Sequence, residues 1–183
     1  CAHSIIVVDD PMAAVFATNA LQRWPGGGGR ASGIALFSGS GGTTAMAGDQ
    51  IVEAGLTLAR PGAETEAALR TYLSSVTIES PYDLGAFRRG FVADDFTAAM
   101  RLVAADPATG FLVYAMSTQP VMAEIADCLI DISRTMAKPV LPVFITGTIA
   151  DPIRRQLAAG GLPYYDSLDD AIRHVNARPR PLA

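Results

Sequence analysis

The chain has 183 residues and a formal net charge of -4; half of its residues are hydrophobic and 17% are charged. That length and apolar content suffice for one compact domain with a substantial core. The acidic balance and the lack of basic runs argue against a nucleic-acid surface, and no apolar stretch reaches the roughly 20 residues that span a bilayer. No signal peptide is visible, so we expect a cytoplasmic protein that binds neither nucleic acid nor membrane.

The two cysteines and the start of the chain bear on its origin. Cys1 and Cys128 have no metal-type spacing, and Cys128 lies in a helical pattern that favours a small buried thiol, so we assume a reducing compartment. The chain begins with Cys and soon enters a predicted strand, which suggests a piece of a longer polypeptide. We expect residues 1–29 to form a lead-in strand, a helix and a glycine linker, and residues 30–183 to form the main domain.

Short apolar runs alternate with helical patterns along the chain. After a strand at 5–8, Asp10 can cap a helix that reaches about Arg23, before the glycine run at 26–29. The further predicted strands are 34–37, 56–59, 111–115, 140–144 and a weaker one at 163–165, with a strand-like run at 76–78. The further predicted helices are 43–54, 64–73, 94–105, 119–136, 151–159 and 167–177. This alternation predicts an α/β fold with a flavodoxin-like, doubly wound, mainly parallel sheet in a three-layer αβα arrangement.

The segment between the strand at 34–37 and the helix at 43–54 is the most informative one. It reads Ser38-Gly39-Ser40-Gly41-Gly42-Thr43-Thr44. The first amide groups of a helix have no partner within it and carry about half a positive charge. Glycines let the backbone approach an anion, and the hydroxyls of Ser38, Ser40, Thr43 and Thr44 can add donors. The segment therefore predicts a phosphate or sulfate site at the carboxyl end of a strand, although a plain strand-to-helix turn needs the same glycines.

Three familiar motifs match this turn less well than a flavodoxin-type phosphate loop. A Walker A loop needs a nearby lysine, and the chain's only lysine is the distant Lys138. A dinucleotide fingerprint needs glycine where Thr44 stands. A nucleophile elbow centred on Ser40, with His174 as the base, lacks its first glycine because Ser38 occupies that position. We expect His174 on the surface at a helix end, where a cation favours the helix dipole.

Several carboxylates lie near the predicted ends of helices and strands. Asp49 falls inside the helix after the glycine turn, and Asp83 falls in a predicted loop at 80–85. Asp83 could cap a helix, bind a hydroxyl or orient a partner, but an Asx-turn carboxylate is equally compatible. Asp94 and Asp95 are typical of a helix start. No cluster of His, Cys and acidic residues supports a metal site.

Four further motifs follow the glycine turn in order. They are Glu-Ala-Gly-Leu-Thr-Leu-Ala at 53–59, Ser-Pro-Tyr-Asp-Leu at 80–84, Lys-Pro-Val at 138–140 and Gly-Gly-Leu-Pro at 160–163. The whole series covers residues 5–177 and resembles the last flavodoxin-like domain in the alpha part of NDP-forming (ADP-forming) acyl-CoA synthetases, the relatives of succinyl-CoA synthetase. Ser80 stands where that family usually has Asn. Some members act on aromatic acids, so the expectation includes a feruloyl-CoA synthetase-like parent.

The resemblance implies a role in an acid–thiol ligase. In that family an acid, CoA and ATP or GTP give acyl-CoA through an acyl phosphate and a phosphohistidine. Ser40, Gly41, Gly42 and Thr43 match the helix start that helps to hold the phosphoryl group on that histidine. Neither histidine of this chain lies in the phosphohistidine motif, so we expect no catalytic residue and no tightly bound cofactor here. The histidine, the CoA site and the ATP or GTP site with Mg²⁺ would lie on other domains or subunits.

Two other functions are compatible with the same fold. One is a non-catalytic interaction or regulatory module, as in relatives that are fused to acetyltransferases. The other is an FMN-binding or nucleotide-binding flavodoxin-like protein, which would hold a phosphate at the same glycine turn.

Overall fold

The computed structural model describes residues 33–73, 79–85 and 90–176, together with the single positions Pro11, Ala14, Val15, Thr18 and Gln22. These five positions are helical, in agreement with the helix predicted over 10–23. The predicted strands at 5–8 and 76–78 and the predicted boundary between residues 29 and 30 lie outside the described residues. Within the described part of the chain, no helix is long and apolar enough to cross a membrane.

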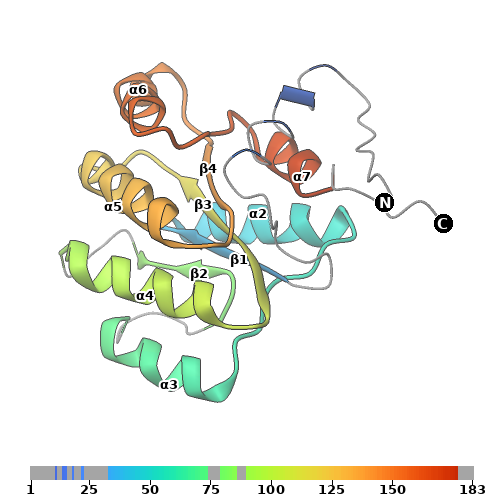
Figure 1. Ribbon diagram of the computed structural model, residues 1–183, viewed down its shortest axis with the longest axis vertical. Coiled ribbons are helices and arrows are strands. Elements are labelled where there is room, and N and C mark those ends of the chain that lie inside the picture. Colours follow the sequence, from blue (N-terminus) through green and yellow to red (C-terminus); the bar gives the residue numbers. More distant parts are fainter. Residues whose placement is uncertain are drawn as a thin grey trace.

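Four parallel strands form the sheet, in the order β2-β1-β3-β4 (Figure 1). They are β1 Gly33–Ser38, β2 Tyr82–Asp83, β3 Thr109–Met116 and β4 Val140–Phe144. Every residue of β1, β3 and β4 is buried, as expected for parallel strands that are covered on both faces. The chain leaves β1 toward β2 on one side and later returns to β3 on the other side. The strand order therefore reverses between β1 and β3.

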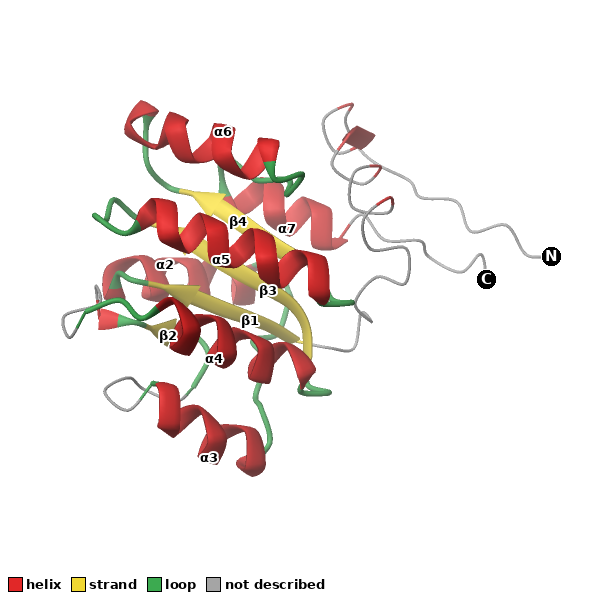
Figure 2. Cartoon of the chain, turned by 60° about the vertical axis from the view of Figure 1, so that its left-hand side comes forward, coloured by secondary structure: helices red, strands yellow, loops and turns green. Residues whose placement is uncertain are grey.

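Helices cover both faces of this sheet (Figure 2). On one face α2 (Gly41–Glu53) and α7 (Leu168–Asn176) contact each other. On the other side a row of four helices makes successive contacts: α3 (Ala63–Tyr72), α4 (Ala93–Ala105), α5 (Met122–Thr135) and α6 (Asp151–Ala159). A short 3-10 helix, η2 (Thr148–Ala150), leads into α6. The arrangement confirms the predicted α/β fold with three layers.

The edges of the sheet beside β1 and β4 differ most from the prediction. The expected strands at 56–59 and 163–165 are reduced to single bridges, Ile34 with Leu58 and Val143 with Tyr165. The predicted loop at 80–85 instead contains β2, which pairs with the end of β1. Local patterns could not show this division, because Leu58 and β2 share the edge of β1 although they are far apart in the chain, and Tyr165 pairs with β4 instead.

Ser80 completes that edge between the bridge and β2. Its hydroxyl donates to the carbonyl of Ile34 and accepts from the amide of Leu36, both at 3.2 Å. One residue of the chain thus replaces a stretch of strand pairing. Ser80 supplies both a donor and an acceptor to β1.

Two helices begin at other residues than predicted. Helix α2 begins at Gly41 rather than Thr43, because Ser40 is the N-cap and the two glycines are already helical. Helix α5 begins at Met122 rather than at residue 119. Glycine has a low helix propensity, and the prediction therefore assigned both glycines to the turn.

The prediction of a surface position for His174 is wrong. Its side chain is 5% exposed, and Nδ1 shares a hydrogen bond with the hydroxyl of Tyr165 at 2.5 Å. It lies three residues after Ala171 and one before Val175, both buried on the inner face of α7. Cys128 is buried in α5, as predicted, and burial raises the pKa of its thiol. Asp94 and Asp95 lie in the first turn of α4, also as predicted.

Asp106 joins three segments at the amino ends of the strands. Its carboxylate accepts hydrogen bonds from the amide of Gly62 at 3.0 Å, the hydroxyl of Thr65 at 2.7 Å and the amide of Ala108 at 2.8 Å. The ammonium group of Lys138 donates to the backbone carbonyl of Asp106 at 2.6 Å. The side chain is buried, so these bonds link the starts of α3 and β3 with the segment before β4.

The charge state of Asp106 should make stability depend on pH. Burial by itself raises the pKa of this carboxyl, but the hydrogen bonds from Thr65, Ala108 and Gly62 and the charge of Lys138 outweigh it and hold the pKa below its ordinary value of 3.8. The folded state therefore binds fewer protons than the unfolded state, and the stabilisation is present above the ordinary pKa and lost as the pH falls through the lowered one. The free energy of unfolding in urea measures this. The difference in that free energy between wild type and Asp106→Asn should become smaller as the pH is lowered from about 6 to about 2. Parallel stability curves would contradict this.

Candidate anion site and adjoining groove

The start of α2 lies at the carboxyl end of β1, where the strand order reverses. In sheets of this kind, ligands bind at such reversal points. Ser40 caps the helix: its hydroxyl accepts from the amide of Thr43 at 3.4 Å, and its carbonyl accepts from the amide of Thr44 at 2.9 Å. The fold therefore brings the predicted glycine turn to the position where a ligand is expected.

Two of the predicted donor hydroxyls serve the turn itself. Ser38 is fully buried, and its hydroxyl accepts from the amide of Ser40 at 3.2 Å. Thr44 is 5% exposed, and its hydroxyl donates to the carbonyl of Gly41 at 2.8 Å. Both side chains shape the start of α2 rather than facing solvent.

Gly41 and Gly42 are the exposed part of this turn. Within the described residues, neither backbone amide has a hydrogen-bond acceptor, as is usual for the first positions of a helix. A Cβ atom added to Gly42 would meet nothing within 4 Å. The space on the side-chain side of Gly42 is therefore open.

Gln119 is a neighbour of the turn that sequence reasoning missed. A Cβ atom on Gly39 would lie 1.8 Å from its side-chain nitrogen, so the Gln119 amide covers Gly39. The same nitrogen donates to the hydroxyl of Ser117 at 3.1 Å. Gln119 lies in the connection that follows β3, and no local pattern relates it to the glycine turn.

The two carboxylates predicted as possible supports of the anion site, Asp83 and Asp49, lie at different distances from it. Asp83 ends β2, and one of its oxygens accepts from the amide of Gly85 at 2.9 Å, which is the Asx-turn bond. Its other oxygen lies beside Gly41, where an added Cβ would approach it to 2.6 Å. Asp49 lies eight residues into α2, about 12 Å along the helix from Gly41. The structure thus brings Asp83 to the predicted anion site and leaves Asp49 away from it.

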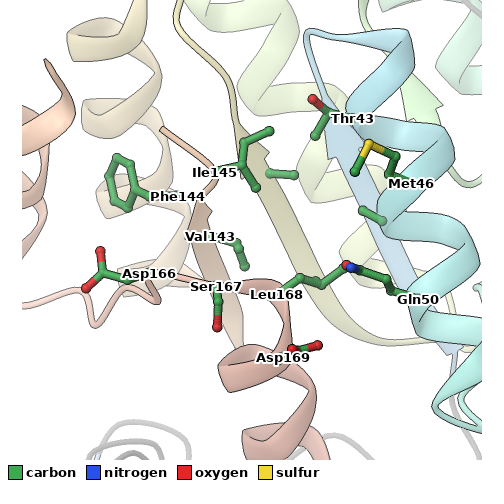
Figure 3. A pocket seen from close by; sticks show the side chains of 12 residues that line it. Thr43, Met46, Gln50, Val143, Phe144, Ile145, Asp166, Ser167, Leu168 and Asp169 are labelled. Atoms are coloured by element: carbon green, nitrogen blue, oxygen red, sulfur yellow. The ribbon is translucent and has the colours of Figure 1, made fainter. Parts of the chain in front are cut away.

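An open groove of about 370 Å³ adjoins the first turn of α2 (Figure 3). Side chains of α2, the end of β4 and the start of α7 line it: Thr43, Met46, Gln50, Val143, Phe144, Ile145, Asp166, Ser167, Leu168 and Asp169. Met46 is 68% exposed and Ile145 is 49% exposed, which is high for large apolar side chains. Among the described residues, no group of three or more His, Cys, Asp or Glu side chains could hold a metal ion.

Solved structures show the same fold. The chain is similar to a protein of Pyrococcus horikoshii OT3, with a TM-score of 0.75 and 22% identity over 94% of this chain and 40% of that one. It is also similar to the dinucleotide-forming acetyl-coenzyme A synthetase 1 of Candidatus Korarchaeum cryptofilum, at 15% identity and a TM-score of 0.72 for the apo form. The form of that enzyme with phosphate and ADP gives 16% identity and a TM-score of 0.71. Both comparisons with this enzyme cover 93% of the present chain and 37% of the synthetase.

Sequence comparison gives a relative of known class. No family model matches the chain. Even so, the chain has a sequence relative among the ADP-forming ligases. The sequence relative is the alpha subunit of the ADP-forming acetate–CoA ligase II of Pyrococcus furiosus, 28% identical over 145 residues. The match covers 75% of this chain and 31% of that subunit, so the chain spans under a third of its relative.

Proposed function

We propose that this chain is one domain of a larger cytoplasmic NDP-forming acyl-CoA synthetase, an acid–thiol ligase. We further propose that the start of α2 holds the phosphoryl group of a phosphohistidine that another domain or subunit supplies. The similarity to an alpha subunit of an ADP-forming acetate–CoA ligase supports the first part. The second part is carried by one observation: the amides of Gly41 and Gly42 are exposed and have no acceptor within the described residues.

The chemistry of backbone amides suits this role. They donate hydrogen bonds to phosphoryl oxygens, they are oriented before the ligand arrives, and they cannot compete as nucleophiles. We assign the contacts to the amides of Gly41 and Gly42 and to the hydroxyl of Thr43, with Ser40 as the cap that holds the Thr43 amide. Asp83 places a negative charge beside Gly41, so a phosphoryl group would approach from the open side of Gly42.

A reconstitution experiment tests the assignment to a ligase. The rest of the parent synthetase is expressed without this chain, and acyl-CoA formation from CoA, ATP and either acetate or ferulate is measured before and after the chain is added. We expect acyl-CoA formation to depend on the added chain, because without it the phosphoryl group would lack the amides of Gly41 and Gly42. No gain on addition would contradict the proposal. A chain that purifies with bound flavin would favour the FMN-binding alternative instead.

A further inference from the structure

The groove between α2 and α7 differs in chemistry from the anion site that it adjoins. Figure 3 shows Met46 on α2 and Ile145 after β4 on opposite walls of the groove, with Asp166 and Asp169 around the start of α7. Two large apolar side chains that remain exposed next to a concave surface mark an interaction site rather than a solvated face. The groove and the anion site share Thr43, in the first turn of α2.

The charges of the groove are negative. Its charged lining residues are Asp166 and Asp169, and no arginine or lysine lines it. One oxygen of Asp166 pairs with Arg154 at 2.8 Å, whereas Asp169 makes no ion pair with any described residue. Asp169 and Asp170 also occupy the first turn of α7, where they neutralise the positive end of the helix dipole. The groove therefore disfavours an anion and favours a cationic group.

We propose that this groove binds a polypeptide segment from another domain or subunit of the synthetase, one in which an apolar side chain is followed by an arginine or lysine. The apolar side chain would contact Met46 and Ile145, and the cation would face Asp169. This inference rests on the proposed function, because the chain spans 31% of its relative and the remainder supplies the partner. Since the groove begins at Thr43, a segment bound in it would be held next to the amides of Gly41 and Gly42.

The test uses the chain with its methionine and isoleucine methyl groups labelled with ¹³C. The titrant is the rest of the parent synthetase, expressed without this chain. Binding should shift the methyl signals of Met46 and Ile145. Met46→Asp should weaken binding about tenfold or more, because it would bury an unpaired carboxylate against an already acidic groove. The control is Val52→Asp: Val52 is 59% exposed on the same helix but lies about 120° around it from Met46, and it should bind like wild type.

Charge gives a second, independent readout. Asp169→Asn keeps the shape of the side chain, so it should weaken binding several-fold at about 50 mM salt and much less at about 500 mM salt, where screening already removes the attraction. Equal effects of Met46→Asp and Val52→Asp, binding without shifts at both methyl groups, or an unchanged affinity of Asp169→Asn at low salt would each overturn the inference. Methyl shifts that depend on the concentration of the chain alone would identify a second copy as the occupant and overturn it too.

The two proposals can fail separately. If the added chain restores acyl-CoA formation and Met46→Asp restores it with the same concentration dependence as wild type, the groove inference is wrong and the proposed function stands. If the wild-type chain neither binds nor restores acyl-CoA formation, the proposed function is wrong, and the groove inference, which depends on it, is wrong too.

Discussion

Replacing Gly42 with proline in the full-length synthetase should slow phosphoenzyme formation by about a hundredfold. Proline removes one amide donor, and losing one preorganised donor of this kind costs a factor of about 10² to 10³. Proline is tolerated in the first turn of a helix, because the amide there has no partner within the helix. An added Cβ at Gly42 would meet nothing within 4 Å, so this atom of the proline ring has room.

The matched control is Gly42→Ala, which keeps the amide. We expect it to form phosphoenzyme within a few-fold of wild type. The measurement is the rate at which ³²P from labelled ATP enters the protein in single-turnover mixing, with thermal unfolding of each variant as a check on folding. Equal rates for Gly42→Pro and Gly42→Ala would remove the start of α2 from the phosphoryl site. Slow rates for both variants would point to the open space rather than the amide as the critical feature.

Replacing Gly33 with alanine should destabilise the domain by about 3 kcal/mol, the upper part of the range for overpacking a buried site. An added Cβ would lie 2.6 Å from both the amide nitrogen and the Cα atom of Ala59 and 2.8 Å from the carbonyl carbon of Leu58. These are backbone atoms, so no side-chain rotation relieves the contact. Ala59 cannot move away freely either, because its amide donates to the carbonyl of Ile34 at 2.8 Å.

Thermal and urea unfolding of the chain measure this effect. For a domain of this size, a loss of about 3 kcal/mol lowers the melting temperature by roughly 10 °C. Gly42→Ala is again the control, since its Cβ enters open space, and we expect its melting temperature to equal or slightly exceed that of wild type. A Gly33→Ala protein as stable as wild type would contradict this prediction. It would show that the backbone at the bridge between Ile34 and Leu58 can shift with little loss of stability.

The proposed anion site and the groove meet at the start of α2 but favour groups of opposite charge. This difference bears on how a multi-domain ligase could use them. The proposed anion site at the amides of Gly41 and Gly42 would attract a negative group, whereas the groove from Thr43 to Asp169 has acidic and apolar walls. A segment that carries both a cation and a phosphoryl group could satisfy both surfaces at once. Its docking would then be specific for charge order along the segment as well as for shape.

The strands and helices with strong local patterns were predicted well from the sequence. The bounds of β4 and α6 were predicted to the residue, and α3, α4 and α7 each differ from their predictions by one residue at one or both ends. In each case the signal is a run of apolar residues or an amphipathic period that a short window contains. The motif-based resemblance also agrees with the sequence relative, an alpha subunit of an ADP-forming acetate–CoA ligase.

The sequence by itself determined the alternation of strands and helices and the place of the glycine turn after β1, because both depend on neighbours within a few residues. The tertiary structure decided the rest. It placed Ser80 on the edge of β1, 44 residues from Leu36, turned His174 inward against Tyr165, and set Gln119 over Gly39. These contacts join residues that no local period relates, so their physical cause is the packing of the whole sheet with its two layers of helices.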